Sequence, residues 1–149
     1  MTKKILAVAS KGGHWIQLQC IAPAFAGHRC TYVSTMQSYA RDVAPSRFIA
    51  VRDATRWNKF GLLVSALQMF WILVRERPDV VLSTGAAPGY FAILFGKLFG
   101  AKTVWIDSVA NAEQLSLSGQ LAGRFADLWL TQWRHLARPG GPNYIGSVL

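Results

Sequence analysis

The feature that most constrains this chain is a regular alternation of short apolar runs with segments of helical length. The apolar runs are rich in Val, Ile and Leu, and Gly or Pro follows most of the longer segments. Such alternation is typical of a parallel sheet with helices on both of its faces. The sequence therefore predicts an α/β fold, a Rossmann-like doubly wound parallel sheet, forming a single domain over residues 1–149.

The apolar runs and the longer segments give the expected elements directly. The predicted strands are Ile5–Ala9, Cys30–Ser34, Phe48–Val51, Val80–Ser83, Thr103–Ile106, Leu128–Thr131 and Tyr144–Ile145. The predicted helices are Trp15–Phe25, Trp57–Arg75, Tyr90–Phe99 and Ser118–Ala126. The N-terminal apolar run is too short for a signal peptide and leads into a glycine loop, so we interpret it as the first strand.

Charge and composition narrow the partners that this chain is expected to bind. The net charge is +9, while hydrophobic residues make up 52% of the chain and charged residues 15%. The basic residues are scattered, whereas nucleic-acid binders usually concentrate them in runs or on one face. We therefore expect an anionic membrane surface rather than nucleic acid, with a solvated basic surface as the plain alternative. Cys20 and Cys30 lack metal spacing, and we expect buried, reduced thiols.

The apolar segment Trp57–Val74 raises the question of a membrane helix. Its most apolar part, Phe60–Val74, is shorter than the roughly 20 residues that a spanning helix needs. A buried crossover helix is the simpler interpretation, because the alternating pattern requires a helix at this place. The functional alternative is a helix that lies partly in the bilayer surface. Its basic flanks, which could touch lipid phosphates, are Arg56, Lys59, Arg75 and Arg77.

The first candidate site is the glycine loop Ser10–His14 that follows the first predicted strand. Gly12 and Gly13 allow a sharp turn and a close approach of a ligand, and the following helix start favours phosphate. His14 would lie at that helix start, where the dipole favours the neutral imidazole that a general base requires. A glycine turn with a bystander histidine is the alternative. The loop matches neither the dinucleotide fingerprint nor a P-loop.

Two further loops are expected at the same edge of the sheet, where ligands of doubly wound folds bind. Gly85, Pro88 and Gly89 follow the fourth strand; Pro88 fits the first turn of a helix, and the small residues of this loop leave room for a ligand. A tight connection between strand and helix explains them equally well. Asp107 and Ser108 follow the fifth strand, where a carboxylate is a candidate base and a helix cap is the alternative.

Taken together, the motifs of these loops resemble one known family. They are Gly12-Gly13-His14 with Leu18, Val81–Gly85 with Pro88-Gly89, Trp105–Ser108, Leu115–Gly119, Ala126-Asp127, Thr131–Trp133 and Tyr144–Gly146. In this order the chain resembles the acceptor-side subunit of the bipartite N-acetylglucosamine transferase that builds dolichol-linked oligosaccharide. It is also similar to bacterial counterparts in exopolysaccharide and capsule synthesis. The glycine–histidine loop resembles that of the one-chain transferase making lipid-linked peptidoglycan precursor.

The resemblance implies the N-terminal half-domain of a GT-B glycosyltransferase, active only with a separate donor-binding subunit. The implied reaction moves a sugar from a UDP-sugar to a polyprenyl-diphosphate-linked saccharide, with neither metal nor cofactor. The apolar segment Trp57–Val74 and the net charge of +9 predict a peripheral location on the cytoplasmic face of the inner (plasma) membrane. Many family members carry Glu in place of Asp107 and a basic residue in place of Asn111 and Gln120.

Roles for individual residues are also expectations at this point. Either His14 or Asp107 is expected to take the proton from the acceptor hydroxyl, and the choice between them stays open. The residues expected to bind the acceptor or its phosphates are Lys11, Gly12, Gly13, Gly85, Pro88, Gly89, Ser108 and Asn111.

Two other functions compete with this one. An oxidoreductase domain would need the dinucleotide fingerprint, which this sequence lacks. A non-catalytic membrane-docking module that recruits the catalytic subunit is the main alternative, and substitution of His14 and Asp107 would separate it from a transferase.

Overall fold

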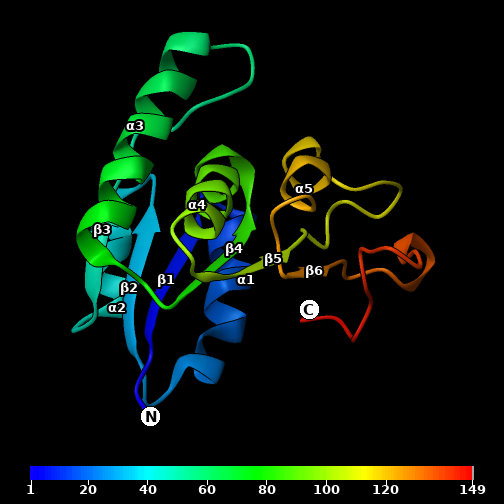
Figure 1. Cartoon of the computed structure of the whole chain (residues 1–149), viewed down its shortest axis with the longest axis horizontal. Helices are drawn as coiled ribbons and strands as arrows, with labels where there is room; N and C mark the ends of the chain where they lie inside the picture. The colour runs from blue at the N-terminus through cyan, green and yellow to red at the C-terminus, as the bar shows by residue number, and fades with distance from the viewer. Residues whose placement is uncertain (149) are drawn as a thin grey trace.

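The computed structural model describes residues 1–148, which form one parallel sheet covered by helices (Figure 1). The six strands lie in the order β3-β2-β1-β4-β5-β6, so the order reverses between β1 and β4. This is the doubly wound, Rossmann-like arrangement that the sequence predicts. The strands are β1 (Lys4–Ala9), β2 (Arg29–Ser34), β3 (Arg47–Ala50), β4 (Val80–Gly85), β5 (Lys102–Ile106) and β6 (Leu128–Leu130).

The helices divide between the two faces of the sheet. On one face pack α1 (Gly13–Ile21), the 3-10 turn η1 (Ala22–Phe25) and α2 (Ala40–Val43), which follows the 3-10 turn η2 (Gln37–Tyr39). On the other face pack α3 (Lys59–Glu76), α4 (Ala86–Leu98) and α5 (Leu117–Ala122). A last 3-10 turn, η3 (Arg134–Leu136), follows β6. Both faces of the sheet are therefore covered, as its apolar strands require.

Local chemistry fixes where these helices begin and end. The Asn58 side chain accepts a hydrogen bond from the Gly61 amide at 2.9 Å, which caps α3. The Ser116 hydroxyl accepts from the Gly119 amide at 2.9 Å in the same way and caps α5. Gly100 adopts a left-handed φ of 86° just after α4, where a glycine commonly ends a helix.

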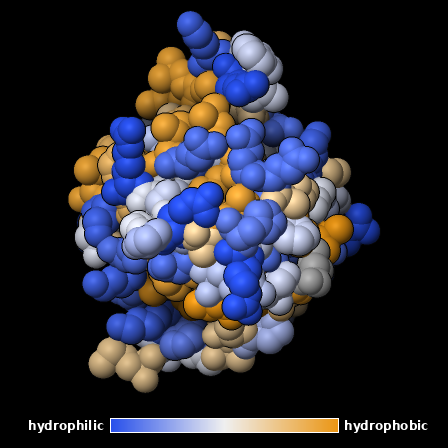
Figure 2. Space-filling model, turned by 90° about the vertical axis from the view of Figure 1, so that its right-hand side faces the viewer, coloured by the Kyte–Doolittle hydropathy of each residue, from blue (hydrophilic) through white to orange (hydrophobic). Residues whose placement is uncertain are grey.

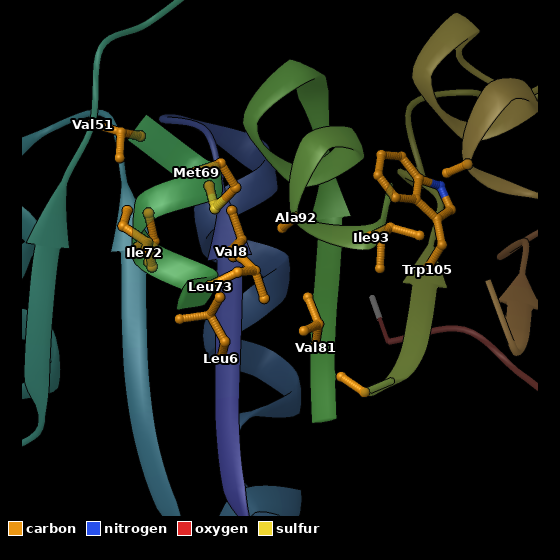
Figure 3. Close-up of a cluster of buried hydrophobic side chains, with 13 residues drawn as sticks. Leu6, Val8, Val51, Met69, Ile72, Leu73, Val81, Ala92, Ile93 and Trp105 are labelled. Carbon is orange, nitrogen blue, oxygen red and sulfur yellow. The ribbon is translucent and has the colours of Figure 1, made fainter. Parts of the chain in front are cut away.

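The core has two apolar layers, one on each side of the sheet. Figure 3 shows the layer in which α3 and α4 press Met69, Leu73 and Ile93 onto Leu6 and Val81 of the central strands. Alternate residues of the same strands point the other way, toward α1. This packing leaves the carboxyl ends of β1, β4 and β5 side by side, where a ligand can be reached by several loops.

Several sequence expectations are wrong in detail. Tyr144–Ile145 is not a strand: Asn143 alone forms an isolated bridge with Leu130, and the Tyr144 ring instead lies 5.2 Å from the Arg134 guanidinium. The first helix changes to a 3-10 turn at Ala22, beside a proline that has no amide hydrogen. The helix expected over Ser118–Ala126 ends at Ala122. Finally, the two thiols expected to be buried are not: Cys20 is exposed and Cys30 is only partly buried.

Candidate functional site

A cavity of about 540 Å³ opens at the carboxyl edge of the sheet, above β1, β4 and β5. Its walls come from the segment before α3, the first turns of α1, α3 and α4, the loop after β5, and α5. The lining residues are His14, Ala54, Arg56, Leu62, Ala86, Ala87, Tyr90, Phe91, Ser108, Ala110, Asn111, Ser116, Leu117, Ser118 and Leu121. The lining is mostly apolar, with a few hydroxyl, amide and cationic groups, as is usual for a ligand site.

His14 is the titratable group in this cavity with the geometry of a general base. Its Nδ1 lies 3.1 Å from the carbonyl oxygen of Thr84, and the Thr84 hydroxyl donates to the His14 carbonyl at 2.6 Å. Because a carbonyl oxygen can only accept, Nδ1 carries the hydrogen, and neutral imidazole then has its lone pair on Nε2. Among the described residues Nε2 has no partner, so it is the nitrogen available to take a proton.

Two backbone features make room for this histidine. The register between β1 and β4 shifts at Thr84, since Val8 pairs with Ser83 but Ala9 pairs with Gly85. The shift is a bulge in β4 at the residue that holds the imidazole. Gly85 has a φ of 150°, and a Cβ there would collide with the His14 ring. Gly85 is thus required for packing, and no larger residue fits beside His14.

Asp107, the other expected base, is engaged by the protein itself. It is 1% exposed and lies directly after β5, and it is absent from the cavity lining. One carboxylate oxygen accepts from Trp105 Nε1 at 3.0 Å and from the Ser116 hydroxyl at 2.7 Å. The other accepts from the Ser116 amide at 3.1 Å and from Asn111 Nδ2 at 3.2 Å. The carboxylate therefore holds the loop between β5 and α5 in shape.

A buried amide pair holds the beginning of the same loop. Gln17 of α1 donates from Nε2 to the Ser108 hydroxyl at 3.0 Å and accepts from the Val109 amide at 3.3 Å. Gln132 donates to the Gln17 side-chain oxygen and, at 3.1 Å, to the Asp107 carbonyl. Because the Ser108 oxygen already accepts from Gln17, its own hydrogen is left to donate into the cavity. The pair thus orients a polar group of the site.

The structure brings together some of the expected site residues and separates others. His14, Ser108 and Asn111 line the cavity, and Gly85 supports it. Lys11, Gly12 and Gly13 lie outside the lining. The Lys11 ammonium lies 3.4 Å from Asp53, and the Gly12 amide donates to the Tyr39 hydroxyl at 3.0 Å. Pro88 and Gly89 are buried in α4, where a Cβ on Gly89 would collide with Ser83.

Several lining residues are not candidates from the sequence alone. Arg56, Leu62, Tyr90, Phe91 and the first turns of α5 are the main additions. The sequence indicates Arg56 only as a flank of an apolar helix. Its place between a predicted third strand and the next helix could have indicated it, because such connections lie at the carboxyl edge.

The chemistry of the cavity is that of a base and hydrogen-bond donors. None of its lining residues is an Asp or a Glu. Residues 1–148 contain no group of three or more His, Cys, Asp or Glu placed to hold a metal ion. The arrangement suits deprotonation of a hydroxyl that is held among Ser, Asn and apolar side chains.

Next to this cavity, α3 carries an apolar face toward solvent. Phe60, Leu63, Leu67 and Trp71 are 67%, 57%, 53% and 59% exposed, and their spacing places them on one side of the helix. Figure 2 shows apolar residues gathered below a hydrophilic tip at the top of the molecule, where α3 begins in Figure 1. The crossover helix is thus buried on one side only. In the described part of the chain, no helix has the length and apolarity needed to cross a bilayer.

Comparison with known families decides the assignment of the chain. The family described as oligosaccharide biosynthesis protein Alg14 like matches residues 25–148, which is most of the sequence. The chain belongs to this family. The resemblance seen in the sequence motifs is therefore confirmed.

Named relatives of this Alg14-like chain are subunits of a transferase. The UDP-N-acetylglucosamine transferase subunit alg14 of Schizosaccharomyces pombe is 35% identical in an alignment of 98 residues that covers 62% of this chain and 40% of that protein. The corresponding subunit of Eremothecium gossypii is 31% identical in an alignment of 111 residues that covers 66% of this chain and 46% of that protein. The Alg14-like chain thus spans less than half the length of these relatives.

Solved structures show the same fold at low sequence identity. MurG of Acinetobacter baumannii matches 97% of the Alg14-like chain and 45% of its own, with a TM-score of 0.78 and 13% identity. The UDP-N-acetylglucosamine 2-epimerase of Rickettsia bellii matches 91% of this chain and 40% of its own, with a TM-score of 0.69 and 17% identity. The fold is therefore that of one half of a GT-B protein, as expected.

Proposed function

We propose that this protein is the acceptor-binding subunit of a two-chain transferase that uses a UDP-sugar. The observation that carries the proposal is the His14 imidazole, fixed through Nδ1 to the Thr84 carbonyl, with Nε2 unpartnered among the described residues beside an apolar-rich cavity. The family and the subunit names of the relatives support it. UDP-N-acetylglucosamine, for which those relatives are named, is the first donor to test.

The proposed reaction is an inverting transfer to a hydroxyl of a polyprenyl-diphosphate-linked saccharide. The acceptor oxygen forms a bond to the anomeric carbon of the donor sugar while the bond from that carbon to the UDP oxygen breaks. The acceptor proton moves to Nε2 of His14, and UDP leaves with the electron pair of the broken bond. Ser108 and Asn111 orient the saccharide, so catalysis combines positioning with deprotonation.

Asp107 has a supporting role in this proposal. Four donor groups already occupy its carboxylate, and substrate would have to displace one of them before the carboxylate could act as a base. It acts instead as a positioning residue for the loop that carries Ser108 and Asn111.

The donor is held by a separate chain in this proposal, because the relatives are named as subunits of a transferase and Arg56 is the one permanently charged residue among those that line the cavity. The partner is a donor-binding GT-B half. The test uses purified protein, labelled UDP-N-acetylglucosamine, membranes that contain lipid-linked acceptor, and the donor-binding chain recovered by co-purification. We expect transfer only when both chains are present. Rapid transfer by this chain alone would contradict the two-chain proposal.

We further propose that the subunit lies peripherally on the cytoplasmic face of the inner (plasma) membrane. The exposed α3 face and the net charge of +9 support an anionic lipid surface as the contact. Lipid contact beside the cavity would bring a membrane-held acceptor to His14. The same face also favours the second candidate, a membrane-docking module without a catalytic role, which requires that substitution of His14 leave the rate unchanged.

A further inference from the structure

A prenyl diphosphate brings at least two negative charges, and the cations expected to meet them are engaged elsewhere. Lys11 pairs with Asp53, and the Gly12 amide donates to Tyr39. Neither residue lines the cavity beside His14. The group that neutralises the diphosphate must therefore come from another part of the structure.

Arg56 is the one permanently charged side chain among the described residues that line this cavity. It lies in the segment between β3 and α3, on the side of the cavity formed by α3. Its guanidinium carbon lies 4.5 Å from the centroid of the Trp57 ring. Stacking on an aromatic face holds the planar group but uses none of its N–H donors. Arg56 has no ion pair within residues 1–148, so those donors are available to an oxyanion.

The rest of the wall indicates what kind of phosphate ester fits here. Leu62 of α3 and Leu117 and Leu121 of α5 line the same cavity, and both α5 leucines are partly exposed, at 48% and 39%. A nucleotide would not need this apolar wall, whereas isoprene units bury their surface against it. The polar side chains of the site, Ser108 and Asn111, lie where a saccharide would need hydrogen-bond partners.

We propose that Arg56 binds the diphosphate of a prenyl diphosphate whose first isoprene units lie against Leu62, Leu117 and Leu121. Arginine presents parallel N–H groups that match two phosphate oxygens at once, which a lysine at this place would not reproduce. The proposal rests on the proposed function for the identity of the acceptor. Its test requires no sugar transfer.

The experiment measures binding of farnesyl diphosphate to the full chain by isothermal titration calorimetry. Arg56→Ala removes charge-assisted hydrogen bonds, and we expect Kd to rise roughly 10- to 100-fold. Arg56→Lys should recover only part of the loss. Arg29→Ala, which removes the same charge from the opposite edge of the sheet, should leave Kd within about twofold. Leu121→Ala should weaken binding of farnesyl diphosphate but leave binding of inorganic pyrophosphate unchanged.

Two parallel titrations separate the sources of the phosphate. If Arg56→Ala weakens binding of UDP and spares farnesyl diphosphate, the site serves the donor and the proposal is overturned. If it weakens only binding to phosphatidylglycerol vesicles, Arg56 is a membrane contact and the proposal is again overturned. If Arg56→Ala leaves farnesyl diphosphate binding unchanged while the two-chain enzyme transfers sugar normally, only the role of Arg56 is rejected, and the proposed function stands. If farnesyl diphosphate binding depends on Arg56 but the two-chain enzyme transfers no sugar, the proposed function is rejected and the inference about Arg56 stands.

Discussion

At the scale of single residues, Asp107 shows how a buried carboxylate can support a site that it does not enter. Asp107→Asn would turn an N–H₂ group toward Trp105, Ser116 or Asn111, which are themselves donors. A buried donor without an acceptor costs about 1–3 kcal/mol. We expect a lower free energy of unfolding by roughly that amount in urea denaturation. Asp53→Asn, at an exposed ion pair, should change it by less than about 0.5 kcal/mol.

The same substitution also separates positioning from direct base chemistry. In a positioning role, the loss of transfer rate follows the loss of loop order and stability. If Asp107→Asn is as stable as the wild-type protein and yet transfers no sugar, Asp107 touches the substrate and is not merely a positioning residue.

The two cysteines should react at different rates with iodoacetamide. Burial raises the pKa of the Cys30 thiol to about 11, which leaves little of the reactive thiolate near neutral pH. Cys20 lies exposed on α1. At pH 8 we expect mass spectrometry to show one fast and one slow alkylation, with the fast one absent in Cys20→Ser. Equal rates at both thiols would contradict the burial of Cys30.

At the scale of elements, the sequence was sufficient to place helices and strands but not to orient α3. The length and apolarity of this helix agree with a fully buried crossover helix as well as with a helix that exposes one apolar face. The residues that face solvent can be recognised only after the packing on the sheet shows which residues face the core. Likewise, the expected strand Tyr144–Ile145 has only two residues, too few for periodicity to test it, and the structure has only an isolated bridge at Asn143 there. The 3-10 turn η2 and helix α2, which lie between β2 and β3, had no apolar pattern of their own.

The exposed face of α3 leads to a membrane-binding prediction. Anionic vesicles should bind the protein, and the affinity should fall as salt rises, because the contact combines basic groups with apolar burial. The double variant Leu63→Glu with Leu67→Glu should lose most of this binding in a flotation assay. Ile16→Glu, on the opposite layer, is the matched control and should bind normally. Wild-type protein that stays unbound at low salt would contradict the proposed location.

Asp127 joins α4, β5 and the start of β6, and its charge makes this junction sensitive to acid. Its pKa is lowered mainly by the hydrogen bond from Lys97, with the Thr103 amide adding to it. A folded pKa below the ordinary 3.8 means stabilisation that is complete above that pH and is lost as the pH falls through the folded value. Asp127→Asn should therefore have a lower free energy of unfolding than the wild-type protein near pH 6. As the pH falls toward 3, the variant should lose less of its free energy of unfolding than the wild-type protein loses. Parallel pH curves would contradict this.

At the scale of the whole molecule, the fold, the edge of the sheet that carries the candidate site and three of its lining residues, His14, Ser108 and Asn111, followed from sequence, whereas the contacts that arrange the site did not. Alternating strands and helices predicted the doubly wound sheet, and the loops after β1, β4 and β5 predicted its reactive edge. The role of Gly85 as space for His14, the pairing of Lys11 with Asp53 and the place of Arg56 in the cavity lining all depend on contacts between residues far apart in sequence. No local pattern contains such contacts.

The most direct test of the proposed function is the transfer rate of the assembled two-chain enzyme that carries His14→Asn. Asparagine can still donate to the Thr84 carbonyl, but it has no nitrogen that could replace Nε2 as a base. We expect kcat to fall about 10²- to 10⁴-fold and the acid limb of its pH profile to disappear, with complex formation unchanged. A variant that keeps most of the wild-type rate would contradict the catalytic role of His14 and place the base on the partner chain.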